Sequence, residues 1–147
     1  MKIGIDSCIL VAGVHANHPL HAVSANWLIR NIPLHKLIVT HHSILEAYAV
    51  LTRLPGKFRI DGIEARQLLE STIRTNITIA KFDAASIWDY ITALVTQAST
   101  GGHSYDAFIA EILINNAIDA IATFNTKHFI RFTPQISIID PSSPMEP

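Results

Sequence analysis

Short apolar runs alternate with longer amphipathic stretches along the 147 residues of this chain. The apolar runs are rich in Ile and Val and do not alternate strictly with polar residues, which is typical of strands covered on both faces. They predict strands at Lys2 to Ile5, Lys36 to Val39, Ile77 to Ala80, Ala120 to Thr123 and Ile136 to Ile139.

The stretches between these runs predict amphipathic helices. Val23, Trp27 and Leu28 share one face of the first of them, and Pro33 ends it. The predicted helices are His21 to Ile32, Ser43 to Leu54, Ile63 to Arg74, Ala84 to Gln97 and Ser104 to Ile118, with a short helix beginning at Ser7. Alternating strands and helices favour the α/β class: a three-layer sandwich in which helices flank a short, mostly parallel sheet.

The composition is that of one globular domain. Hydrophobic residues make up 49% of the chain and charged residues 16%, so apolar surface is sufficient for a core and disorder is not expected. We expect a single domain over residues 1–141. Residues 142–147 contain prolines and few apolar side chains, and we expect them to form a disordered tail.

The length of the apolar stretches and the number of cysteines indicate the cellular compartment. No apolar stretch approaches the roughly 20 residues that cross a bilayer, and Asp6 comes too early for a signal-peptide core. Cys8 is the only cysteine, so an intrachain disulfide is impossible. We therefore expect a cytoplasmic protein without a membrane partner. The net charge of −1 does not by itself indicate a nucleic-acid binder.

Three carboxylates lie where the chain enters a helix. Asp6 follows the first strand, Glu46 lies just inside the helix after the second strand, and Asp106 opens the helix after Gly101 and Gly102. The carboxyl ends of parallel strands share one edge of a sheet, and ligands bind there in open α/β folds. A cluster of carboxylates at that edge indicates a site for a hard divalent cation and hence phosphate-ester chemistry.

Each acid also has a structural explanation. Asp6 can cap the helix that begins at Ser7, and Ser43 with Glu46 matches a capping box. Asp106 would complement the dipole of its helix. Taken singly these explanations are favoured, but neutral Ser, Thr or Asn would cap equally well. Three neighbouring carboxylates repel one another unless a cation neutralises them, so together they favour the metal site.

The ordered set of these segments resembles the PIN-domain nucleases, and within them the VapC-type toxins of toxin–antitoxin pairs. The resemblance runs through the strand ending in Asp6, the stretch from Ser43 to Pro55, the Asp106-Ala107 helix start, and the strand exit from Thr123 to Phe129. The ending Ile139-Asp140-Pro141 also matches. The likeness covers nearly the whole chain in the right order.

The resemblance implies a Mg²⁺- or Mn²⁺-dependent endoribonuclease that is paired with an antitoxin and forms a homodimer. It assigns metal ligation to Asp6 and Asp106, and ligation or water activation to Glu46. The family's fourth acidic position falls on Asn125, which offers an oxygen without a charge. A second tightly held ion is therefore not expected.

Other polar residues are candidates for RNA contacts. Ser7 and Thr123 are expected to hold phosphate oxygens. Four cations are expected either to contact the RNA backbone or to be solvated surface charges: Arg53, Lys57, Arg59 and Lys127.

The histidines invite a zinc interpretation, because His15, His18 and His21 recur at every third position. No cysteine accompanies them, so we do not favour it.

Two alternative functions remain open from sequence. One is a PIN-like module that binds metal or RNA with weakened catalysis, for which Asn125 is the sign. The other is a phosphatase that forms an aspartyl-phosphate on Asp6. That chemistry usually places a second acid two residues after the nucleophile, and Cys8 occupies that position here.

Overall fold

The computed structural model describes residues 1–132 and 134–143, and in these residues five parallel strands form one sheet. The strands are β1 (Lys2–Ile5), β2 (Lys36–Val39), β3 (Thr78–Ile79), β4 (Ala120–Ala122) and β5 (Ser137–Ile139). Their order is β3-β2-β1-β4-β5, and every neighbouring pair is parallel. All of the predicted strands are confirmed, the last three shortened by one residue at one or both ends.

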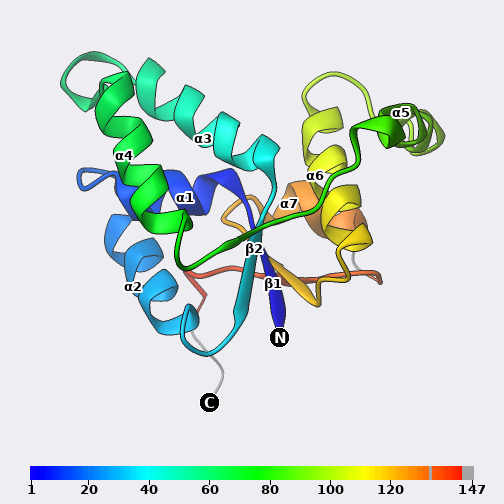
Figure 1. Cartoon of the computed structure of the whole chain (residues 1–147), viewed down its shortest axis with the longest axis horizontal. Coiled ribbons are helices and arrows are strands. Elements are labelled where there is room, and N and C mark those ends of the chain that lie inside the picture. The colour runs from blue at the N-terminus through cyan, green and yellow to red at the C-terminus, as the bar shows by residue number, and fades with distance from the viewer. Residues whose placement is uncertain (133, 144–147) are drawn as a thin grey trace.

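Helices cover both faces of the sheet, as Figure 1 shows. The helices α1 to α4 lie on one side, and α5, α6 and α7 lie on the other. Their bounds are α1 (Ser7–Val14), α2 (His21–Asn31), α3 (His41–Arg53), α4 (Gly62–Ile73), α5 (Ile87–Thr96), α6 (His103–Asn115) and α7 (Thr126–Phe129). Single turns of 3-10 helix are η1 (Gly56–Phe58), η2 (Ala84–Ser86) and η3 (Ile130–Phe132). The three-layer α/β sandwich is confirmed. Among the described helices, none has both the length and the apolar character to span a membrane.

Strand β1 lies between the two apolar cores, and its successive residues face them alternately. Ile3 and Ile5 are buried against α1 to α4. Gly4 faces the other side, where a Cβ atom would lie 2.7 Å from Leu113 Cδ1 of α6. The missing side chain lets α6, the helix that carries Asp106, pack directly on the central strand.

The start of α3 differs from the prediction. The helix begins at His41 rather than Ser43, and Thr40 is its N-cap, accepting a hydrogen bond from the Ser43 amide at 2.9 Å. Both Thr40 and Ser43 are suitable capping residues, and the strand ends early enough for the first of them to act. The predicted capping box is therefore wrong: Glu46 lies in the second turn of α3, beyond reach of the N-cap amide.

Other helix ends differ as well. Helix α6 ends at Asn115, three residues before the predicted Ile118, and α2 and α4 differ by one residue. The predicted helix from Ala84 begins as the 3-10 turn η2 before α5, and Asp83 caps this turn by accepting from the Ala85 amide at 3.0 Å. The short helix α7 was not predicted, because four residues are too few to show a helical period. Of the tail predicted at 142–147, residues 144–147 lie outside the described residues; the Ser142 amide donates to Asp140 Oδ1 at 2.9 Å.

Candidate active site at the carboxyl edge of the sheet

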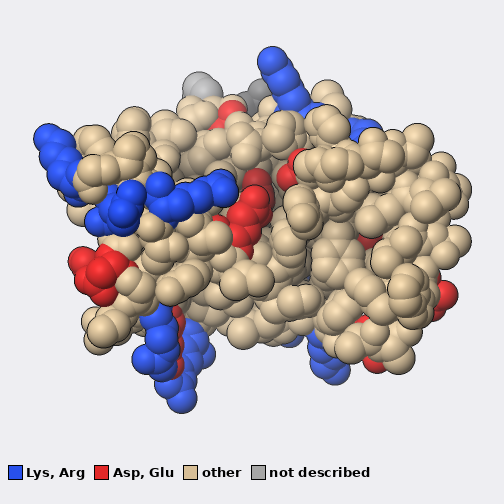
Figure 2. Space-filling view, turned by 90° about the horizontal axis from the view of Figure 1, so that it is seen from above, with Lys and Arg blue, Asp and Glu red and all other residues tan. Residues whose placement is uncertain are grey.

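One acidic cavity opens at the carboxyl edge of the sheet. Its lining includes Asp6 after β1, Glu46 from α3, Asp106 from α6 and Asn125 after β4, in a volume of about 360 Å³. The remaining lining residues are Ser7, Gly102, His103, Tyr105 and His128. Figure 2 looks onto this edge and shows acidic side chains gathered in a hollow at the middle of the face. The sequence prediction that residues 6, 46 and 106 share one pocket is confirmed.

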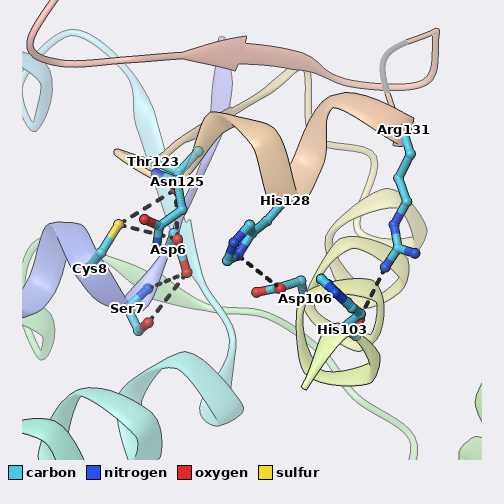
Figure 3. Close-up of polar contacts among 9 residues, drawn as sticks. All are labelled: Asp6, Ser7, Cys8, His103, Asp106, Thr123, Asn125, His128 and Arg131. Atoms are coloured by element: carbon cyan, nitrogen blue, oxygen red, sulfur yellow. Dashed lines mark hydrogen bonds and ion pairs between the residues drawn. The ribbon is translucent and has the colours of Figure 1, made fainter. Parts of the chain in front are cut away.

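Asp6 is held rigidly. Its side chain is buried and caps α1, with Oδ1 accepting from the Ser7 amide at 2.7 Å. Its Oδ2 accepts from the Thr123 hydroxyl at 2.7 Å and from the Cys8 thiol at 3.2 Å. The structural and the functional interpretation of Asp6 therefore both hold, because the capping carboxylate also faces the cavity (Figure 3).

Thr123 and Cys8 contact Asp6 and are not among the residues that line the cavity. Thr123 is completely buried, and its hydroxyl also accepts from the Asn125 amide at 2.9 Å. We therefore reassign Thr123 from a phosphate contact to a residue that fixes Asp6. Burial, followed by the neighbouring Asp6 charge, raises the pKa of the Cys8 thiol to about 12, which is typical of an unreactive buried thiol.

Asp106 faces a histidine across the cavity. His128 Nδ1 lies 3.1 Å from Asp106 Oδ2, and Figure 3 shows the ring pointing from α7 toward α6. Burial raises the pKa of Asp106; His128 lowers it, and the carboxylates of Asp6 and Glu46 raise it again. The net direction is upward, and burial is its largest cause.

The donor chemistry fits a hard divalent cation. The carboxylates of Asp6, Glu46 and Asp106 and the Asn125 amide are the oxygen donors that Mg²⁺ and Mn²⁺ prefer. Within the described residues, no three His, Cys, Asp or Glu side chains converge closely enough to ligate one ion together. The carboxylates thus share a cavity while remaining apart, and a cation would remove the repulsion that raises the pKa of Asp106.

The comparisons with known proteins agree with this geometry. The family model of the PIN domain matches residues 3–133, most of the chain. The chain belongs to the PIN domain family.

Relatives of this PIN domain carry VapC names. It is 32% identical over 107 residues to Ribonuclease VapC40 of Mycobacterium tuberculosis, covering 73% of this chain and 75% of that protein. Ribonuclease VapC27 of the same species is 24% identical over 109 residues, covering 74% of each chain. The resemblance to VapC-type PIN domains is thereby confirmed.

Solved structures share the PIN fold. The sarcin-ricin-loop-cleaving toxin VapC20 of M. tuberculosis matches with a TM-score of 0.69 at 15% identity, over 88% of this chain and 94% of that one. VapBC2 of Rickettsia felis, bound to a promoter DNA fragment, matches with a TM-score of 0.66 at 19% identity, over 95% and 98% of the two chains.

Sequence reasoning missed His103, Tyr105 and His128 in this PIN domain. It weighed other histidines, whose rings contact the backbone: His15 Nε2 lies 2.8 Å from the Phe58 carbonyl oxygen, and His21 Nδ1 lies 2.9 Å from that of Ala12. His103 and Tyr105 lie within three positions of Asp106, and His128 lies in the segment from Thr123 to Phe129 that carries the family resemblance. This nearness in sequence was the signal that could have identified them.

The predicted basic contacts do not line the cavity. Arg53, Lys57, Arg59 and Lys127 are all exposed on the surface. Figure 2 shows Lys and Arg side chains beside the acidic hollow, on the side where Figure 1 shows the connection between α3 and α4. They remain candidates for contacts to RNA outside the cavity.

Proposed function

We propose that this chain is a metal-dependent endoribonuclease that hydrolyses RNA phosphodiester bonds as the toxin of a type II toxin–antitoxin pair. The observation that carries the proposal is the single cavity shared by Asp6, Glu46, Asp106 and Asn125. The ribonuclease names of the relatives support RNA as the substrate.

The residues that would hold Mg²⁺ or Mn²⁺ are Asp6, Asp106 and Glu46, with Asn125 as a neutral oxygen donor. When bound, the cation supplies Lewis acidity at the phosphoryl oxygen and a lower pKa for water. Asp6 enters this role already fixed by Thr123 and Ser7, so little ordering is needed.

The protein's own groups orient and move protons. Glu46 is only partly buried and is placed to accept a proton from the attacking water. Ser7 lines the cavity at the start of α1 and is positioned to donate to a phosphate oxygen. His128 holds the Asp106 carboxylate in place at 3.1 Å.

The direct experiment incubates the purified chain with RNA and Mg²⁺ or Mn²⁺, with and without EDTA. Cleavage should require the divalent ion and should be lost in Asp106→Asn. A matched control is Glu64→Gln on the surface of α4, which should cleave like the unmodified chain. Cleavage that persists in EDTA, or is undiminished in Asp106→Asn, contradicts the proposal.

The partners follow from the same cavity. An antitoxin has to cover an acidic hollow, and an inserted Arg or Lys would pair with its carboxylates. A similar structure that contains an antitoxin, VapBC-1 of nontypeable Haemophilus influenzae, supports such a partner, with a TM-score of 0.66. For the homodimer, α5 offers exposed apolar side chains at Trp88, Ile91 and Val95.

Asn125 favours one alternative, a module that binds the cation or RNA without turnover. The residue is exposed at the cavity and carries no charge. Calorimetry with Mn²⁺ beside the cleavage assay separates the two functions, because the alternative predicts binding without cleavage.

A further inference from the structure

A pair of stacked rings, the exposed Tyr105 and the half-buried His42, lies at the mouth of the acidic cavity. Tyr105 lines the cavity, and 58% of its surface is exposed. Its ring stacks on the ring of His42 from α3, with centroids 5.1 Å apart and planes inclined by 15°. Large exposed rings of this kind are costly to leave in water, and they are frequent where flat ligands bind.

The two rings are held in place from behind. Phe108 meets His42 edge-on, with the centroids 6.0 Å apart at 86°. Phe108 in turn packs edge-on against Phe82 at 5.6 Å and against Tyr90 at 5.3 Å. Tyr90 is buried, so this ring cluster reaches from the core to the rim of the cavity. The outer pair is therefore a preorganised flat surface, and little side-chain entropy is lost when a ligand stacks on it.

The pair is tied to the carboxylates through the helices. Tyr105 immediately precedes Asp106 on α6, and His42 lies one helical turn before Glu46 on α3. A phosphate held among the carboxylates would thus have a flat aromatic surface next to it. Unpaired nucleotides of RNA offer the matching shape, because a base attached to that phosphate can be turned out and stacked on an aromatic side chain.

We propose that Tyr105, backed by His42, is a stacking platform for an unpaired nucleobase next to the scissile phosphate. The inference rests on the proposed ribonuclease function and specifies its substrate as single-stranded RNA at that nucleotide. Stacking tolerates any base, so the platform contributes affinity and position more than sequence selection.

The test uses short single-stranded RNA carrying one 2-aminopurine, whose fluorescence falls when the base stacks. Binding is measured in the Asp106→Asn background, in which cleavage should be lost. Tyr105→Ala should weaken binding by roughly 5- to 150-fold and abolish the fall in fluorescence. Tyr105→Trp should retain both, whereas Tyr105→Leu keeps apolar bulk without a ring and should lose both.

Two controls make the result specific. Tyr48→Ala removes another exposed tyrosine, which lines a different cavity between α3 and α4, and it should bind RNA normally. Fully paired RNA should bind Tyr105→Ala and its parent equally.

The outcomes distinguish failure of the stacking platform from failure of the proposed ribonuclease function. Equal binding and equal fluorescence loss in Tyr105→Ala and its parent would overturn the platform while leaving the nuclease standing. A parent that binds no single-stranded RNA would overturn the RNA substrate and the platform together.

Discussion

At the scale of single residues, Asp106 is the carboxylate of the cavity whose pKa is raised. Burial and the charges of Asp6 and Glu46 raise its pKa, although His128 opposes them. Without a cation, the neutral Asp106→Asn side chain should relieve this repulsion. We expect Asp106→Asn to raise the melting temperature of the metal-free protein while abolishing its stabilisation by Mn²⁺. Thermal melts with and without Mn²⁺ measure both effects; a lower melting temperature in EDTA would contradict the electrostatic account.

The raised pKa of Asp106 also sets the sign of two pH dependences. A carboxyl must be ionised to ligate a cation, so Mn²⁺ affinity should fall as the pH is lowered. Because the pKa of Asp106 is raised, the fall should begin at a higher pH than for an ordinary aspartate. The metal-free protein should respond in the opposite sense. Because the folded state holds this proton more tightly than the unfolded chain, the contribution of Asp106 to stability rises as pH falls through its raised pKa. Calorimetry and melts over a pH series test these slopes.

His128 orients the same carboxylate, since Nδ1 lies 3.1 Å from Asp106 Oδ2. Removing the ring in His128→Ala deletes the contact that lowers the pKa of Asp106. We expect Mn²⁺ affinity to fall roughly 10-fold, as for other residues that support a metal ligand, and its pH midpoint to move upward. Lys127→Ala, the neighbouring exposed side chain outside the cavity, is the matched control. An unchanged Mn²⁺ affinity in His128→Ala would show that His128 does not orient Asp106 for metal binding.

At the scale of elements, the cap of α3 decides where Glu46 and His42 point. Thr40 is completely buried, and its hydroxyl accepts from the Ser43 amide and contacts the Ser43 hydroxyl at 2.9 Å. Thr40→Ala should cost about 1 kcal/mol in the free energy of unfolding, and Thr40→Ser should retain most of it. Urea titrations give both values. A cost equal in the two variants would show that packing of the methyl group, not the cap, is what matters.

The contact between β1 and α6 depends on Gly4. A Cβ atom there would lie 2.7 Å from Leu113 Cδ1 and 3.2 Å from Ile118 Cδ1, both buried side chains. Gly4→Val should therefore destabilise the fold by about 1–3 kcal/mol through overpacking. It should also weaken Mn²⁺ binding, because α6 carries Asp106. Stability near that of the unmodified chain would mean that α6 shifts freely on the sheet.

The sequence predicted elements better than it predicted their ends. Apolar runs located every strand of the described sheet. Burial on both faces explains the runs of β1, β2 and β4, whereas both residues of the edge strand β3 are exposed. The sequence pattern could not choose between Thr40 and Ser43 as the N-cap of α3, because both side chains carry a hydroxyl that can accept from a backbone amide. The choice depends on the residue at which β2 ends. The pairing of His128 with Asp106 was also out of reach, because it depends on how α7 and α6 approach in space.

At the scale of the whole molecule, the fold brings distant acids to one edge of one sheet. Asp6 and Asp106 are 100 positions apart in sequence, yet they line the same cavity with Glu46. The rule that parallel strands present their carboxyl ends together places Asp6 and Glu46 at this edge, because both follow strands. It does not place Asp106, whose helix α6 follows another helix. The rule did not predict the other residues around the cavity. Tyr105, His103 and His128 lie on α6 and α7, and the spacing of apolar residues does not show how these helices are oriented.

The central proposal is that the cavity lined by the carboxylates of Asp6, Glu46 and Asp106 binds a divalent cation, which would draw together side chains that lie apart in the described residues. The most direct measurement is anomalous diffraction from crystals of the full chain grown with Mn²⁺. The account predicts one strong anomalous peak inside the cavity, with carboxylate oxygens at about 2.0–2.3 Å from it. A cavity that stays empty at saturating Mn²⁺, or an ion bound elsewhere without these side chains, would contradict it.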